Sequence, residues 1–153
     1  MIVYINGNDN RCKQLAKLMI ADGYQIQEDS RLISSCDIIY LGKDGQGFEQ
    51  VDFKNNAIVL SLLKNQRLCY LSKLKGFNYR YLYSDEDFVV ENTHISDEAV
   101  IAYMIIDNSI SLSNSNVLIL GYGHCGRDLA AKLEKFNAKV SISNRSDHYH
   151  DEV

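Results

Sequence analysis

The sequence predicts an α/β fold in which an N-terminal domain with a parallel sheet precedes an incomplete strand–helix–strand unit. Two observations support this prediction. Short apolar runs alternate with stretches of helical periodicity, a pattern typical of parallel sheets covered by helices. Closer to the C-terminus, Gly121, Gly123 and Gly126 lie between an apolar run and a helical stretch.

The N-terminal domain is predicted to begin with a strand at Ile2–Ile5, a turn, and a helix over residues 11–21. In this helix Leu15, Leu18 and Met19 recur at the spacing of one helical face, and a glycine suited to a C-terminal cap follows. The remaining elements of this domain are predicted as strands over residues 24–27, 37–41, 57–62 and 79–83, a loop over residues 43–56 and a helix over residues 65–74.

A second long helix is predicted over residues 97–106, with Ser96 as its N-cap and acidic residues in its first turn. Apolar residues lie on nearly every side of it, so we expect it to pack between two layers. Residues 107–116 are rich in Ser and Asn and are predicted to join two domains. The predicted organisation is an N-terminal domain at 1–95, an interdomain helix and linker at 96–115, and a partial dinucleotide-binding domain at 116–153.

The three glycines have the spacing of a dinucleotide-binding turn between a strand at Asn116–Leu120 and a helix over residues 127–136. In such a turn Gly121 permits the sharp bend, Gly123 admits the pyrophosphate, and Gly126 lets the helix pack closely on the strand. The free N–H groups at the start of the helix attract the phosphates. The alternative interpretation is that the glycines only shape a tight joint.

The intervening residues Tyr122, His124 and Cys125 complete the predicted cofactor loop. Cys125 is interpreted as a filler of this loop rather than a nucleophile, although a helix N-terminus can lower a thiol pKa. With the following strand at Lys139–Ser143, the segment is predicted to be the first βαβ unit of a Rossmann domain, placed after a flavodoxin-like or Rossmann-like N-terminal sheet domain.

The residues that follow this last strand are expected to select the cofactor. NAD-selective sites usually place Asp or Glu about 20 residues past the glycines, where the carboxylate binds the ribose 2′-hydroxyl. Here Asn144, Arg145 and Ser146 occupy the position, and Arg145 and Ser146 suit a 2′-phosphate. NADP is therefore predicted as the cofactor, and NAD is the alternative. The other interpretation of Arg145 is that it is a solvated surface residue.

Composition excludes several partners. A formal net charge of −4 with scattered basic residues argues against binding of nucleic acid. No apolar run approaches the roughly 20 residues that span a bilayer, and the N-terminus lacks the features of a signal peptide; we therefore expect a cytoplasmic protein. The tail contains potential metal ligands but is interpreted as a disordered terminus, so no metal site is predicted; these ligands are His148, His150, Asp151 and Glu152.

In their order along nearly the whole chain, these features resemble the dipicolinate synthase A family. Residues 7–11 are similar to the family's Gly-Gly-Asp-x-Arg opening, and residues 36–39 to its Cys-Asp-apolar third strand. Residues 92–98 are similar to Asn-Ser-Ile-Pro-Thr-x-Glu, and residues 117–126 to Val-Leu-Gly-x-Gly-Arg-x-Gly. The chain departs from the family at three positions. Ile95 stands where the family has Pro, Ala99 where it often has Gly, and His124 where it usually has Arg.

The resemblance implies a nicotinamide-dependent oxidation of a dihydrodipicolinate-type precursor, a small dicarboxylate, to dipicolinate during spore formation. It also implies a ligand cleft between the two domains, lined by Asp9, Arg11, Asn92, Thr93, Ser96 and Glu98. Arg11 could bind a substrate carboxylate through both of its terminal nitrogens, or it could be a surface residue. No catalytic acid or base is predicted.

A Rossmann domain has about six strands, but after the glycine turn this sequence supplies only one helix and one strand, and the nicotinamide half is expected to be absent. We therefore expect either an incomplete part of a working oxidoreductase or a non-catalytic remnant that binds a partner subunit or a nucleotide. The 2-hydroxyacid dehydrogenases share the same general layout, so a protein of that type is a further alternative. A flavodoxin-like response module would need an acidic pocket, which Asp9 and Asp37 do not form convincingly. The exposed strand edge is expected to pair with a second copy, as in a homodimer, or with a partner.

Overall fold

The structure is a computed structural model that describes residues 1–108 and 111–145. The chain forms two compact units, Met1–Asp85 and Glu86–Val153. Each unit contains parallel strands joined through helices, which confirms the predicted α/β fold class. The predicted boundary between residues 95 and 96 falls inside a helix of the second unit.

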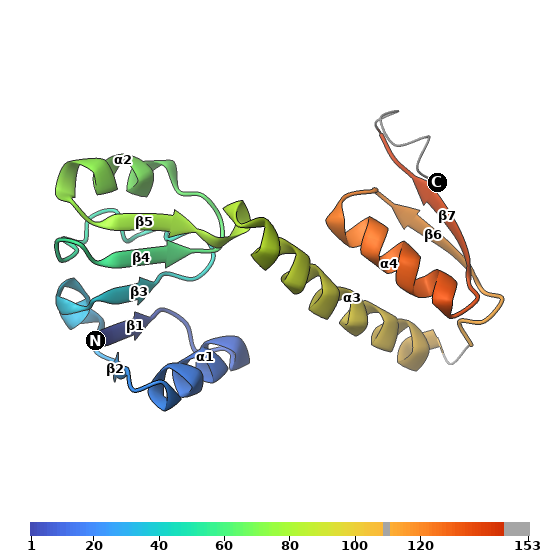
Figure 1. Ribbon diagram of the computed structural model, residues 1–153, viewed down its shortest axis with the longest axis horizontal. Coiled ribbons are helices and arrows are strands. Elements are labelled where there is room, and N and C mark those ends of the chain that lie inside the picture. The colour runs from blue at the N-terminus through green and yellow to red at the C-terminus, as the bar shows by residue number, and fades with distance from the viewer. Residues whose placement is uncertain (109–110, 146–153) are drawn as a thin grey trace. The chain divides into compact units, whose positions relative to one another are not determined.

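The first unit is a five-stranded parallel sheet with the strand order β2-β1-β3-β4-β5 (Figure 1). This is the flavodoxin-like order, in which the chain reverses its direction of travel across the sheet between β1 and β3. The strands are β1 (Ile2–Ile5), β2 (Gln25–Gln27), β3 (Ile38–Tyr40), β4 (Ile58–Ser61) and β5 (Asn78–Tyr81). The helices are α1 (Asn10–Ala21), α2 (Gln66–Lys75) and the 3₁₀ helices Ser30–Ser35 and Leu82–Ser84.

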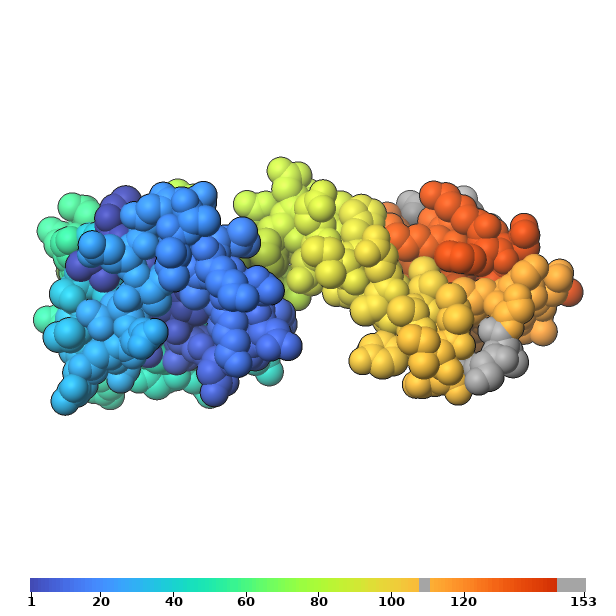
Figure 2. Space-filling view, turned by 90° about the horizontal axis from the view of Figure 1, so that it is seen from below, coloured from blue at the N-terminus to red at the C-terminus, as the bar shows by residue number. Residues whose placement is uncertain are grey.

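The core of the first unit follows from the strand register. Tyr4 pairs with Ile39, and Ile39 pairs with Val59, so these side chains share one face of the sheet. They cluster with Leu68 of α2, and Ile39, Val59 and Leu68 have no exposed surface. Figure 2 shows the N-terminal part of the chain, drawn in blue, making up much of one face of this unit. The predicted strands and helices of this unit are confirmed, with ends shifted slightly, and residues 43–56 form a loop.

The second unit contains α3 (Glu86–Asn108), β6 (Asn116–Leu120), α4 (His124–Lys135) and β7 (Lys139–Ser143). Strands β6 and β7 pair in parallel along all five residues of each, and α4 connects them (Figure 1). Helices α3 and α4 pack on each other. The core consists of apolar residues from α3, the segment before β6, β6 and α4, namely Ile101, Leu112, Ile119, Ala130 and Leu133.

The predicted start of the long helix at Ser96 is wrong, because α3 begins at Glu86. Ser96 lies inside the helix, and its hydroxyl donates to the carbonyl of Asn92 at 2.8 Å. The buried stripe of this helix begins with Thr93 and Asp97 before it reaches Ile101. Because polar residues occupy two of these positions, hydrophobic periodicity does not reveal the first half of the helix.

The expectation that this helix packs between two layers is also wrong for the described part of the chain. Its buried stripe faces α4, whereas Tyr103 and Ile106 are 67% and 71% exposed. Side chains of α3, drawn in yellow, lie at the surface in Figure 2. Within the described ranges, no helix combines the length and apolar character needed to cross a membrane.

Candidate functional site

The turn between β6 and α4 has the geometry expected of a phosphate-binding turn. Gly121 adopts φ +106°, a region that side chains disfavour. Its N–H donates to the carbonyl of Ser143 at 2.7 Å, which continues the β6–β7 ladder by one step. The turn therefore starts directly beside the end of β7, where the sequence predicted the ribose contacts.

Gly126 allows a close approach between helix and turn. A Cβ atom at this position would lie 2.2 Å from the carbonyl oxygen of Gly121, and 3.5 Å from Cγ2 of Ile119. No real side chain tolerates a backbone atom at 2.2 Å, so α4 packs at a distance that only glycine permits. The role predicted for the third glycine, close packing of helix on strand, matches this contact.

Gly123 presents an open backbone at the start of α4. It is the N-cap of α4, and a Cβ atom there would meet nothing within 4 Å. Helix α4 begins at His124 rather than at the predicted residue 127, so His124, Cys125 and Gly126 form its first turn. Because no side chain caps this helix end, its first N–H groups suit an anionic ligand.

A pocket of about 360 Å³ lies where β6 and β7 end, lined by Leu120, Gly121, Ser143, Asn144 and Arg145. Asn144 and Arg145 are both exposed, and Oδ1 of Asn144 accepts a hydrogen bond from the backbone N–H of Arg145 at 3.0 Å. The third predicted residue of this group, Ser146, and the histidines of the tail lie outside the described residues.

The other residues of the predicted cofactor loop contact the helices around it. The guanidinium carbon of Arg127 lies 5.3 Å from the ring centroid of Tyr122, a cation–π contact that joins the turn to α4. The Cys125 thiol lies 3.7 Å from the hydroxyl of Thr93 on α3. His124 is exposed.

Two of the predicted cleft residues, Asp9 and Arg11, lie together at the start of α1 in the first unit. Asp9 is the N-cap and accepts a hydrogen bond from the backbone N–H of Cys12 at 2.9 Å. Arg11 donates to the other carboxylate oxygen of Asp9 at 2.9 Å. The bond from Cys12 and then that from Arg11 lower the pKa of Asp9 to about 2. Arg11 thus already has one carboxylate partner, although its side chain is 85% exposed.

The other four candidates lie on α3 in the second unit but on different sides of the helix. Thr93 is buried against α4, whereas Ser96 and Glu98 are exposed and Asn92 is half-buried. The structure therefore groups Asp9 with Arg11 and brings Thr93 to the glycine turn. Ser96 and Glu98 lie away from the buried stripe of α3.

Sequence reasoning missed a charged cluster where α3 and α4 meet. Nδ1 of His94 lies 2.9 Å from Oδ1 of Asp128, and the ammonium of Lys132 lies 2.7 Å from Oδ2 of Asp128. Lys132 also donates to the backbone carbonyl of His94 at 2.9 Å. Asp97 completes the cluster and is 2% exposed. The only signals in the sequence are the spacings His94-x-x-Asp97 and Asp128-x-x-x-Lys132, which are common in solvated helices.

The pKa values of the two carboxyl groups in this cluster are shifted in opposite directions. Burial, then a hydrogen bond to Asp128 and its charge, raise the pKa of Asp97 to about 6. Burial would also raise the pKa of Asp128, but hydrogen bonds from Lys132, His94 and Asp97 lower it overall. Within the described residues, Oδ2 of Asp97 is buried without a partner, which fits a protonated carboxyl that donates to Asp128.

These features define the class of fold: it is the Rossmann-type α/β fold that dehydrogenases also have. A D-isomer specific 2-hydroxyacid dehydrogenase from Lactobacillus delbrueckii ssp. bulgaricus, solved in its NAD-complexed form, aligns with 99% of this chain and 55% of its own, with a TM-score of 0.51 and 11% identity. Its likeness to this chain is therefore one of fold.

Within this class, the structure is similar to dipicolinate synthase A from Bacillus halodurans. The alignment covers 99% of this chain and 63% of the other, with a TM-score of 0.71 and 20% identity. The fold thus confirms the resemblance seen in the motifs, and this chain spans about 63% of that protein's length. In sequence, 53 residues are 32% identical to an adenosylhomocysteinase from Haloquadratum walsbyi, covering 35% of this chain and 12% of that protein. No family model matches the sequence.

Proposed function

We propose that this chain belongs to a nicotinamide-dependent oxidoreductase that binds its cofactor at the turn between β6 and α4. One observation carries the proposal: the parallel β6–α4–β7 unit places the glycine turn and the end of β7 around one pocket. The uncapped first turn of α4 suits the pyrophosphate, and Gly123 leaves its approach open. A bound nicotinamide would supply the hydride acceptor of an oxidation.

The cofactor that suits this pocket better is NADP. A carboxylate that would hold the ribose 2′-hydroxyl of NAD is missing from the described lining of the pocket, where Asn144 and Arg145 stand instead. A guanidinium matches the geometry and charge of a 2′-phosphate. NAD is the alternative, as in the dehydrogenase that was solved with it.

The substrate that we propose is a small dicarboxylate of the dihydrodipicolinate type, oxidised to dipicolinate. This rests on the motifs at residues 7–11 and 92–98 and on the similarity in fold to dipicolinate synthase A. Sporulation, a cytoplasmic location and a homodimer belong to the same proposal. The 2-hydroxyacid dehydrogenases share the fold, so a 2-hydroxyacid is the competing substrate.

Calorimetric titration of the chain with NADP⁺ and with NAD⁺ tests the cofactor site. We expect a dissociation constant below about 1 mM for NADP⁺, with weaker binding of NAD⁺. Arg145→Gln is expected to weaken NADP⁺ binding about tenfold or more and to leave NAD⁺ binding unchanged, because only NADP⁺ carries the 2′-phosphate.

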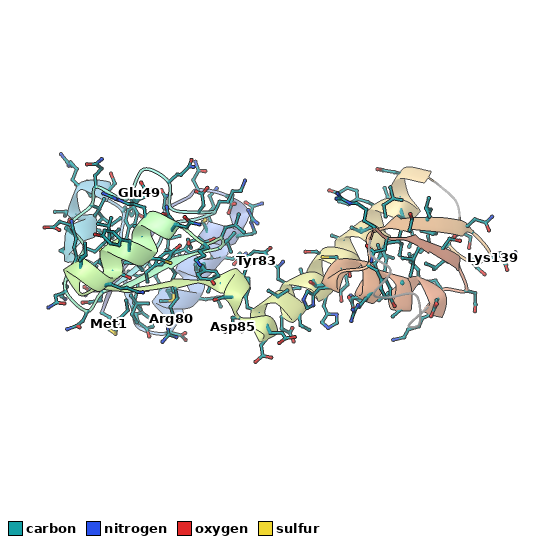
Figure 3. All side chains as sticks on the ribbon, turned by 90° about the horizontal axis from the view of Figure 1, so that it is seen from above. Met1, Glu49, Arg80, Tyr83, Asp85 and Lys139 are labelled. Carbon is teal, nitrogen blue, oxygen red and sulfur yellow. The ribbon has the colours of Figure 1, made fainter. Side chains whose placement is uncertain are left out.

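Lys139→Gln is the matched control, since Lys139 is an exposed basic residue at the opposite end of β7 (Figure 3). It should change neither affinity. If neither dinucleotide binds to the wild-type chain, the glycine turn is only a structural joint and the protein is the non-catalytic alternative. If both variants lower affinity for NADP⁺ equally, the effect is one of general charge and Arg145 has no specific role.

A further inference from the structure

A second pocket of about 280 Å³ lies where α3 meets the first turns of α4. Its lining residues are Val90, Thr93, His94, His124, Arg127 and Asp128. All of them belong to the second unit. Its lining residue His124 is the first residue of α4 and directly follows Gly123 of the glycine turn.

We propose that His94 and Asp128 form an acid–base dyad, whose Nε2 atom exchanges a proton with an acidic substrate bound in this pocket. The inference rests on the proposed oxidoreductase function and names the residue that would handle the substrate proton. The sequence motifs predicted no catalytic acid or base, because His94 and Asp128 lie far apart in the sequence.

The geometry holds the imidazole of His94 in a defined orientation. An ionised carboxylate can accept a hydrogen bond but cannot donate one, and Oδ1 of Asp128 lies 2.9 Å from Nδ1 of His94. The neutral ring therefore carries its proton on Nδ1. Nε2 then keeps the lone pair and can accept a proton. Lys132 fixes both partners, since it pairs with Asp128 and donates to the carbonyl of His94.

The surrounding charges keep Asp128 ionised. Hydrogen bonds from Lys132, His94 and Asp97 lower its pKa despite burial, whereas burial and the neighbouring Asp128 raise the pKa of Asp97 to about 6. The ionised carboxylate would stabilise the imidazolium that forms when Nε2 takes up a proton. On this reasoning His94 contacts the substrate and Asp128 is a positioning residue.

The pocket lining suits a small organic acid. Arg127 and His124 offer donors to a carboxylate, and the Tyr122 ring supports the guanidinium of Arg127. Val90 adds an apolar wall for a flat ring. Oxidation of a carbon–nitrogen or carbon–oxygen single bond to a double bond removes a hydride from carbon and a proton from the heteroatom. A bound oxidised nicotinamide would supply the hydride acceptor. Nε2 of His94 would take up the proton and release it to solvent through the exposed edge of the ring.

The position of the His94 proton can be read by ¹⁵N NMR of the histidine-labelled chain. The dyad predicts protonation on Nδ1 in the neutral ring, whereas a solvated imidazole favours Nε2. Asp128→Asn is expected to reduce the share protonated on Nδ1, because an amide can donate to that atom as well as accept from it. A wild-type His94 protonated mainly on Nε2 would overturn the proposal.

Ligand binding supplies the second readout. Dipicolinate up to about 10 mM is expected to shift the Nε2 resonance of His94, and pyridine, which lacks the carboxylates, is not. Calorimetry in buffers of different ionisation enthalpy should show proton uptake on dipicolinate binding, since a bound carboxylate favours the imidazolium. An unmoved Nε2 resonance, or no proton uptake, contradicts the role of His94.

His94→Asn separates this role from a purely structural one. The asparagine amide can occupy the place of Nδ1 and keep the contact with Asp128, but it has no Nε2. We expect unchanged unfolding free energy and an unchanged NADP⁺ dissociation constant, with proton uptake abolished. Equal uptake in both proteins would overturn the dyad. Failure of the wild-type chain to bind either NADP⁺ or NAD⁺ refutes the proposed oxidoreductase function instead. The NMR result tests the dyad independently of that outcome.

Discussion

At the scale of single residues, the glycines of the turn after β6 are required for different physical reasons. Gly121 adopts a backbone conformation that other residues disfavour, and Gly126 lies against a backbone oxygen. Gly123 has an ordinary extended backbone, with φ −84° and ψ −164°, and open space where a side chain would project. Only the first two are therefore needed for folding, whereas the open space at Gly123 suits the proposed ligand.

This difference yields a paired prediction. Gly126→Ala should lower the free energy of unfolding of the second unit by about 1–3 kcal/mol, because the new Cβ overlaps a backbone carbonyl. Gly123→Asp should leave stability unchanged or raise it by about a few tenths of a kcal/mol, because Asp is a good N-cap. The new carboxylate should nevertheless abolish NADP⁺ binding by repelling the phosphates. Urea unfolding and calorimetry measure the two effects, and full NADP⁺ binding by Gly123→Asp would refute the phosphate site.

Asp97 gives a second residue-scale prediction, based on pH. Its pKa is raised from 3.8 to about 6 on folding, so its contribution to stability is complete below about pH 4 and is lost as pH rises through about 6. Asp97→Asn cannot ionise and still donates to Asp128. It should therefore match the wild type near pH 3.5 and exceed it near pH 8, by about 1–3 kcal/mol.

Urea unfolding at a series of pH values, followed through the methyl signals of Leu133, measures this difference. Leu133 reports on the second unit because it is fully buried in its core. Asp128→Asn is the informative comparison, since the pKa of Asp128 is lowered on folding and its loss should reduce stability at pH 8. Parallel pH profiles for the wild type and Asp97→Asn would show that folding does not shift the pKa of Asp97.

At the scale of elements, α3 illustrates how tertiary contacts decide a helix boundary. Its buried stripe consists of Thr93, Asp97 and Ile101 at helical spacing. The polar pair at its start is stabilised by partners on α4, namely Cys125 for Thr93 and Asp128 for Asp97. A stripe that contains hydrogen-bonded polar residues does not produce the periodicity from which helices are predicted.

The one-sided packing of α3 can be tested with two isoleucines. Ile101→Ala should lower the stability of the second unit by about 2–5 kcal/mol, since Ile101 belongs to the core with Ile119 and Leu133. Ile106→Ala, at a position 71% exposed, should change it by less than about 0.5 kcal/mol. Chemical denaturation of both variants gives the comparison, and equal losses would indicate that α3 is buried on both sides.

At the scale of the whole molecule, the chain has two separate cores. One is centred on the five-stranded sheet and the other on the packing of α3 and α4 against β6. The sheet of the second unit is covered by α4 on the face that includes Ile119. On its other face Leu118 and Leu120 are 62% and 79% exposed. Exposed apolar surface of this kind favours association.

We expect a second copy of the chain to cover this surface. Leu118→Lys with Leu120→Lys should shift the chain from dimer to monomer in sedimentation velocity, because burial of a lysine without a partner is costly. Leu74→Lys is the control, since Leu74 is 65% exposed on α2 of the first unit, and it should leave the dimer intact. A wild-type chain that sediments as a monomer at all concentrations would exclude the homodimer.

The sequence alone was sufficient to predict those parts of the structure that depend on residues close together in the chain. Strands β6 and β7 match their predicted bounds, and the roles assigned to Gly121 and Gly126 match their conformation and contacts. The parallel sheet of the first unit was also predicted, because alternating strands and helices leave few arrangements. The resemblance to dipicolinate synthase A, based on short motifs, agrees with the fold.

The start of α3 and the cluster that holds His94 against Asp128 became visible only in three dimensions. These two residues come from different helices, and each is ordinary within its own helix. Whether a histidine is solvated or paired depends on which helix faces it, and that is set by packing in the second core rather than by local sequence. The α/β layout and the glycine turn could be read from the order of residues, because both follow from local periodicity and backbone sterics. Folding alone decided that the pKa of Asp97 rises while that of Asp128 falls, and that Asp128 contacts His94, because burial and through-space contacts set all three.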